Sequence, residues 1–386
     1  MSNKSSTLTA IYLATFFYAI HYSLTLYIES SFLSNFIPTE SVGLIFTVAA
    51  LASIIVLFNL PPFLRRFGNY KLAVTATITE IVALFLISTI TTPGIIVFFF
   101  VVHHVFLNIM YFSLTVFLES FSDDETTGNS RGVFLTIVST AILIGPFVAG
   151  NIMSSASYPK IYALSGILIL PILFIIGKHL RNFTDHTYTS ISFIQTILTI
   201  LREKNLRNVF VVQFLLQFFY GVMVIYTPIY LHTQIGIPMS QILGIVMPIA
   251  LLPFIIFPYF LGNLADKKYG EKEMLFIGFL IITISTAALS FISSTIALVW
   301  AGALLLTRVG ATFIETMAEV YFFKQIDASG AHIISFFRNM SSFSYLISPV
   351  IASAFLSVFD YRFIFLGLSI VMLIGLRYSF ILKDTK

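Results

Sequence analysis

Four polar residues share one face of a predicted helix in an otherwise apolar stretch of the chain. They are Arg308, Thr312, Glu315 and Glu319, and spacings of 4, 3 and 4 residues align their side chains on one side of an α-helix. An ionised side chain at the centre of a membrane costs at least about 2.5–3.5 kcal/mol on insertion scales. We therefore expect this stripe to face water or polar partners, with Arg308 at the substrate or proton site and Glu315 carrying a proton.

A second polar stripe lies 204 positions earlier in the chain (308 minus 104). It consists of His104, Asn108, Tyr111 and Thr115, so a neutral, titratable face corresponds to the charged one. Polar residues on two further apolar segments complete the set. The residues that we expect to line a substrate and proton cavity are His21, Tyr22, His104, Asn108, Tyr111, Gln213, Gln217, Tyr220, Arg308 and Glu315.

Two adjacent histidines raise the question of a metal site. His103 and His104 point about 100° apart on a helix, so we expect that they do not face one cavity, and we predict no metal and no cofactor. His104 can change its protonation near neutral pH, whereas His103 is expected to be packed and hydrogen-bonded. Glu80 either pairs with a neighbouring helix or titrates, and the pairing is favoured.

The elements that carry these residues are membrane helices. Only 10% of the 386 residues are charged and 58% are hydrophobic, whereas a soluble domain has about a quarter of its residues charged. Apolar segments of about 20 residues predict spanning helices. We predict twelve, near residues 8–28, 42–62, 71–91, 94–120, 131–153, 160–179, 206–231, 240–262, 273–292, 296–323, 331–357 and 361–382. The fold class is therefore an all-α integral membrane protein.

Basic residues predict the orientation of these helices. Alternate loops are rich in Lys and Arg, whereas the opposite loops hold only Lys160 and Arg362. Basic loops stay in the cytoplasm, so an even number of helices places both termini there. The net charge of +4 then reflects topology, and no nucleic-acid partner is expected. The first apolar segment lacks a cleavage site and should remain as a helix; short loops favour a prokaryotic inner membrane.

The chain also repeats. Its long polar connection, residues 181–205, separates an N-terminal six-helix bundle (1–180) from a C-terminal one (206–386), and part of it could form an amphipathic helix on the inner membrane surface. "RRFGNYK" from Arg65 lines up with "KKYGEKE" from Lys267, and "IGPFVAG" lines up with "ISPVIAS". Two such repeats are one known architecture of secondary transporters, with the site at their interface.

The loop "GNLADKKYGEK" resembles the signature of the major facilitator superfamily, a glycine, an Asp four residues later and basic residues around a second glycine. Glycines permit a tight turn, and the acid can cap or pair with a helix end. In the first repeat Leu60 and Leu64 replace the first glycine and the Asp. The residues that we expect to act as gates and latches are Gly262, Asp266, Lys267, Gly270, Arg65, Arg66, Glu119, Arg131, Glu319 and Arg338.

The fifth predicted helix resembles a glycine pattern of proton-coupled exporters in that superfamily. Gly132, Gly145, Pro146 and Gly150 match it, whereas Ala141 and Ala149 stand where glycines are usual. Small residues at such spacings let helices pack closely, which is the ordinary structural alternative. The resemblance covers all twelve helices and implies a monomer whose helices 1, 4, 7 and 10 line the cavity.

We expect a membrane transporter and not an enzyme. The favoured function is proton-coupled export of lipophilic or amphiphilic compounds by alternating access, since the chain has no Gly-x-x-x-x-Gly-Lys loop for ATP. A proton-coupled uptake porter for sugars or organic anions is the alternative, and a lipid scramblase is a weaker one. The expected partners are a small-molecule substrate, protons and the lipid bilayer.

Overall fold

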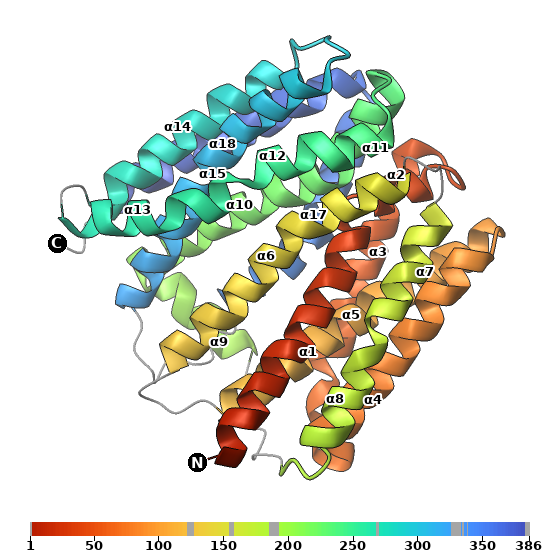
Figure 1. The fold of residues 1–386 in the computed structure, drawn as a ribbon. Coiled ribbons are helices and arrows are strands. Elements are labelled where there is room, and N and C mark those ends of the chain that lie inside the picture. Colours follow the sequence, from red (N-terminus) through yellow and green to blue (C-terminus); the bar gives the residue numbers. More distant parts are fainter. Residues whose placement is uncertain are drawn as a thin grey trace. The chain divides into compact units, whose positions relative to one another are not determined.

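The chain forms two compact helical units. The computed structural model describes residues 2–121, 127–153, 158–184, 193–267, 270–325, 333, 336–337 and 339–382. Unit 1 comprises Met1–Ser190 and unit 2 comprises Ile191–Lys386. The division falls within the polar connection at residues 181–205, and the described residues of both units contain helices and no strands. Within each unit, long helices run side by side (Figure 1).

Unit 1 is built around its first helix. Its helices are α1 (Ser2–Leu26), α2 (Glu29–Leu33), α3 (Thr39–Phe58), α4 (Leu60–Thr89), α5 (Pro93–Phe121), α6 (Thr127–Met153), α7 (Tyr158–Leu168) and α8 (Leu170–His179). Helix α1 packs on α5, α6, α7 and α8, while α4 packs along α5. Ile11, Leu114, Phe117 and Ile176 are among the buried apolar residues that join these helices in one core.

Helix α4 contains the turn between the second and third predicted spans. Gly68 lies inside it with φ 77° and ψ 160°, a conformation that interrupts the helix. This region of backbone space is open essentially to glycine alone. The glycine of "RRFGNYK" therefore makes the tight turn that the sequence predicts.

Unit 2 repeats the pattern with more local breaks. Its elements are α9 (Phe193–Arg202), α10 (Lys204–Ile229), η1 (Tyr230–Gln234), α11 (Met239–Gln241), η2 (Ile242–Val246), α12 (Met247–Leu251), α13 (Pro253–Lys267), α14 (Glu271–Leu289), α15 (Ala297–Gln325), α17 (Met340–Leu356), η4 (Tyr361–Phe363) and α18 (Ile364–Ile381). Helix α10 packs on α17 as α1 packs on α6, and α14 packs on α15 as α4 packs on α5. Pro228 lies near the end of α10, just before the π-helical turn η1.

The helix positions agree with a twelve-span membrane protein. Among the described residues, ten segments are long and apolar enough to cross a membrane, and Met340–Leu356 is a shorter apolar helix. The 25-residue helix α1 takes the remaining position. The amphipathic helix expected in the linker is present as α9.

Candidate functional site

The side chain of Arg308 is enclosed within unit 2. It is only 3% exposed, and its Nη1 atom has no hydrogen-bond partner among the described residues. Its guanidinium carbon lies 5.2 Å from the ring centre of Phe219 and 5.8 Å from that of Tyr220, both on α10. In the described part of the chain it forms no salt bridge. A guanidinium held on aromatic faces with a free donor can bind an anionic or hydroxyl group.

Tyr220 also contacts the acid of the same stripe. Its hydroxyl donates a hydrogen bond of 2.9 Å to Glu315 Oε2. Arg308 and Glu315 are seven residues apart, about 10 Å along α15, so one aromatic residue of α10 connects two groups that do not pair directly. The arrangement places a cation, an aromatic surface and a carboxyl group along one helix interface.

The other polar residues predicted in unit 2 lie on the same two helices. Gln213 is buried and its Oε1 atom has no hydrogen-bond partner, while Gln217 is half-buried. Thr312 donates to the backbone carbonyl of Arg308 at 2.7 Å, so its hydroxyl is used within α15. Gln213 thus offers a buried acceptor on α10, and the hydroxyl of Thr312 is already used within α15.

The predicted cavity residues of unit 1 divide into two groups. Tyr111 is 37% exposed, and its ring lies 5.9 Å from that of Tyr18; Tyr22 and Asn108 are half-buried. His21 is instead fully buried, with its Nε2 atom 3.4 Å from Glu80 Oε1. His21 was expected to line a substrate and proton cavity, but its side chain is enclosed inside unit 1.

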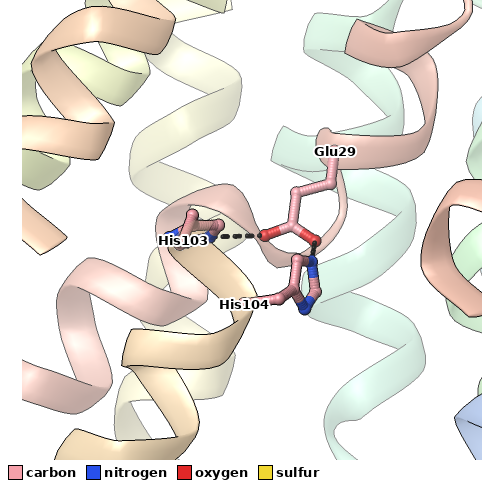
Figure 2. A group of neighbouring side chains, drawn as sticks. All are labelled: Glu29, His103 and His104. Carbon is pink, nitrogen blue, oxygen red and sulfur yellow. Dashed lines mark hydrogen bonds and ion pairs between the residues drawn. The ribbon is translucent and has the colours of Figure 1, made fainter. Parts of the chain in front are cut away.

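His103 and His104 both contact one acid, although the angle of about 100° between them on a helix was expected to keep them from facing one cavity. Glu29 lies between them, with Oε1 at 3.2 Å from His103 Nε2 and Oε2 at 3.0 Å from His104 Nε2 (Figure 2). The 100° between adjacent side chains is spanned by the two oxygens of one carboxylate. Glu29 was not predicted from the sequence, although an acid directly after an apolar helix, in "YIESSFL", indicates a buried polar group.

Glu80 pairs with neighbouring helices, as favoured from the sequence. Its Oε1 atom contacts His103 Nδ1 on α5 and lies near His21 on α1. His103 is packed and hydrogen-bonded through both ring nitrogens, which also agrees with the expectation. Three helices and α2 thus converge on one buried group of two acids and three histidines.

Comparison with known proteins places this geometry in a family. Residues 11–331 match the sequence model of the Major Facilitator Superfamily. The chain belongs to the Major Facilitator Superfamily. The match spans most of both six-helix halves.

Solved structures of the superfamily share the fold. A mutant of the nucleoside transporter NupG is similar with a TM-score of 0.75 and 12% identity, over 97% of this chain and 98% of that one. A second crystal structure of nucleoside transporter NupG gives a TM-score of 0.74 at 12% identity, over 99% and 100% of the two chains. At this identity the likeness concerns the fold. Among curated proteins there is no significant match.

The superfamily loop is anchored by a residue that the sequence analysis missed. Glu271, directly after Gly270, is fully buried and accepts a hydrogen bond of 2.5 Å from Lys324 Nζ at the end of α15. Gly270 has φ −73°, which any residue can adopt. The backbone at Gly270 therefore does not require a glycine, in contrast to Gly68.

Several expected gate residues cannot be placed by their side chains. Arg338 lies outside the described residues, and the structure describes only the backbone of Gly262, Asp266, Lys267, Arg131 and Gly132. Arg65 and Arg66 are exposed, and the guanidinium of Arg66 lies 5.2 Å from the ring centre of Phe67. Glu119 is exposed and Glu319 is half-buried.

The glycine pattern of α6 makes a close helix contact. A Cβ atom on Gly145 would overlap Ser23 Oγ of α1 and lie 2.6 Å from the carbonyl carbon of Ser23. In unit 2 the same contact has its residues exchanged, since Gly221 of α10 abuts Ser348 of α17. Pro146 and Gly150 are also buried in α6. At Gly145 the pattern therefore lets α6 approach the backbone of α1 closely.

Proposed function

We propose that this superfamily member is a proton-coupled secondary active transporter that exports amphiphilic compounds by alternating access. The substrate would bind at the interface of α10 and α15 in unit 2. Its polar head would meet Arg308, and its apolar body would lie on Phe219 and Tyr220.

The observation that supports this proposal most strongly is the state of Arg308. A buried guanidinium that forms no salt bridge is costly to maintain in a membrane protein, and intramembrane charges of this kind mark substrate or ion pathways. The rings of Phe219 and Tyr220 hold the guanidinium group in place, and its Nη1 atom remains available to a substrate. A carboxylate, phosphate or hydroxyl group of a substrate would satisfy that nitrogen.

The proton would be carried by Glu315. The half-buried carboxyl group accepts a hydrogen bond from Tyr220, the residue that also supports Arg308. A substrate that moves Tyr220 would therefore change the environment of the proton carrier. This shared contact gives a physical route for coupling between the substrate and the proton.

Export is favoured by the α6 pattern of Gly145, Pro146 and Gly150, which resembles that of proton-coupled exporters. A second candidate is uptake of an organic anion or sugar, because the open donor of Arg308 would serve an imported anion equally well. In either case we propose a monomer in a prokaryotic inner membrane with both termini in the cytoplasm. The amides of Gln213 and Gln217 on α10 would add polar contacts.

The experiment is proton movement in vesicles that contain the purified protein and a trapped pH dye. A lipophilic cation, an amphiphilic carboxylate and a sugar are added in turn under an imposed pH gradient. The proposal predicts proton flux with the carboxylate, at least tenfold weaker in Arg308→Lys, because lysine lacks the planar fork. Arg207→Lys, an exposed arginine on α10, is the matched control.

The direction of transport is measured in the same vesicles with labelled carboxylate, while a pH gradient is the driving force. Accumulation against its gradient in exchange for protons supports export. Movement of substrate and protons in the same direction supports the uptake candidate. If Arg308→Lys behaves as the wild type, the proposed substrate site is wrong.

A further inference from the structure

A buried group of acids and histidines occupies unit 1, separate from the Arg308 interface. Glu29 of α2 is 1% exposed, His103 is fully buried and His104 is 17% exposed. The candidate ligand atoms of these three residues all lie within 4.8 Å of one another. Figure 2 shows the carboxylate of Glu29 between the two imidazole rings, with one oxygen turned to each.

Both imidazole rings turn the same nitrogen to Glu29. The Nε2 atoms of His103 and His104 lie 3.2 and 3.0 Å from its two oxygens. Only Tyr27 and Ile28 separate α1 from the short helix α2, whose first residue, Glu29, contacts two adjacent histidines of α5. Two imidazole nitrogens and one carboxylate oxygen therefore converge from two different segments.

A second carboxylate holds one of the rings in place. His103 Nδ1 is hydrogen-bonded to Glu80 Oε1, which leaves Nε2 directed at Glu29. Histidines that bind metals usually donate a hydrogen bond from the N–H group of their other ring nitrogen to a carboxylate or another acceptor. This bond fixes both the tautomer and the ring orientation. His21 lies beside the same Glu80 oxygen, and its Nδ1 atom contacts the carbonyl of Tyr18. Glu80 is thus itself held by a further helix.

The charges of the group favour a bound cation. Glu29 and Glu80 are both buried carboxylates, and in the described part of the chain neither has a lysine or arginine within ion-pair distance. Burying such charges is costly unless cations or metals compensate them. The available ligands are nitrogen and oxygen atoms, a set that suits Zn²⁺ and similar transition metals. Ca²⁺ and Mg²⁺ prefer oxygen ligands alone.

We propose that Glu29, His103 and His104 bind one divalent transition-metal ion. Glu80 is the positioning residue of this site, since it orients His103. The partial exposure of His104 gives the ion a side from which to enter, and three protein ligands leave a fourth position for water or a transported ligand. The site does not depend on the substrate or the direction of transport proposed above.

The test is metal binding by the full-length protein in detergent, with any affinity tag removed. The protein is stripped with a chelator, loaded with Zn²⁺, desalted and assayed for zinc by mass spectrometry. Co²⁺ is loaded in parallel, because its visible absorption reports its coordination number and geometry. We expect one ion per chain and a Co²⁺ absorption band that Zn²⁺ abolishes.

Variants separate the ligands from their support. Glu29→Gln and His104→Gln should lose the bound ion, and Glu80→Gln should weaken binding by about 10- to 100-fold, as for other outer-shell partners. Glu40 and His232 are exposed, so Glu40→Gln and His232→Gln are controls that should keep the bound ion. Wild-type protein that binds no zinc overturns the proposal, as does undiminished binding in folded Glu29→Gln and His104→Gln, which would show adventitious surface binding.

Discussion

Asn69 and Glu271 occupy corresponding positions in the two halves of the chain, and each is fully buried directly after a loop glycine. Asn69 donates from Nδ2 to the backbone carbonyl of Ser113 on α5 at 3.0 Å. Glu271 accepts from Lys324 on α15. Both residues therefore tie the start of one helix to its neighbour, and the difference of 202 positions (271 minus 69) agrees with the repeat seen in the sequence.

The ion pair between Glu271 and Lys324 should contribute to stability. In Glu271→Gln the ion pair is lost while the shape is kept, so we expect a loss of about 1–3 kcal/mol, typical of a hydrogen bond to a charged group. Lys324 is 37% exposed, which limits the loss. Thermal unfolding in detergent measures it. Lys324→Met in the Glu271→Gln background should add little, and full additivity of the two changes would contradict the pairing.

The two loop glycines should differ in their tolerance of a side chain. Gly68 has φ 77° and Gly270 has φ −73°. Alanine at position 68 would be strained by about 1–3 kcal/mol, whereas Gly270→Ala should be nearly neutral. Unfolding temperatures of the two variants provide the comparison. If both variants lower the unfolding temperature equally, the positive φ of Gly68 is not the cause of its loss of stability.

The small-residue contacts predict a second asymmetry. Gly145→Ala brings a methyl group within 2.6 Å of the Ser23 backbone, so α1 and α6 must separate; overpacking of this kind costs about 1–3 kcal/mol. Gly221→Ala meets mainly the Ser348 hydroxyl, which has no hydrogen-bond partner to lose. Gly221→Ala should therefore be milder, and Ser348→Gly should rescue it.

Unfolding temperatures of these variants are compared with Gly94→Ala, because a Cβ atom there meets nothing within 4 Å. If Gly145→Ala is as stable as Gly94→Ala, then α1 and α6 do not pack at this distance. Failure of Ser348→Gly to restore Gly221→Ala would show that another contact limits that position.

Tyr220 should have two separable roles. Tyr220→Phe removes the hydrogen bond to Glu315 but keeps an aromatic ring beside Arg308, whereas Tyr220→Leu removes both. We expect Tyr220→Phe to weaken proton coupling with little change in substrate affinity. Tyr220→Leu should also weaken substrate binding, by up to about 30-fold, since a cation–π contact contributes about 0.5–2 kcal/mol. Binding and proton flux are measured on the same preparations. Equal effects of both variants on substrate affinity would contradict the separate roles of the Tyr220 hydroxyl and ring.

Much of the fold could be predicted because hydropathy reports spans and the repeat reports symmetry. The Arg308 stripe was predictable for the same reason, since a charge in an apolar helix is conspicuous. Glu29 was not, because its partners His103 and His104 lie 74 and 75 positions away in the chain, on another helix. The rule that separates adjacent side chains by 100° applies within one helix and says nothing of a carboxylate that arrives from another segment. Glu271 was hidden for a similar reason, since its partner Lys324 is 53 positions away.

The most direct test of proton coupling compares two reactions of Glu315→Gln in vesicles. Substrate exchange across the membrane without net proton movement needs binding and alternating access, whereas accumulation driven by a pH gradient also needs the proton carrier. We predict that the variant keeps exchange within a few fold of the wild type and loses accumulation together with substrate-dependent proton flux. Accumulation and proton flux at wild-type levels in Glu315→Gln would contradict the assignment of Glu315 as the proton-carrying acid.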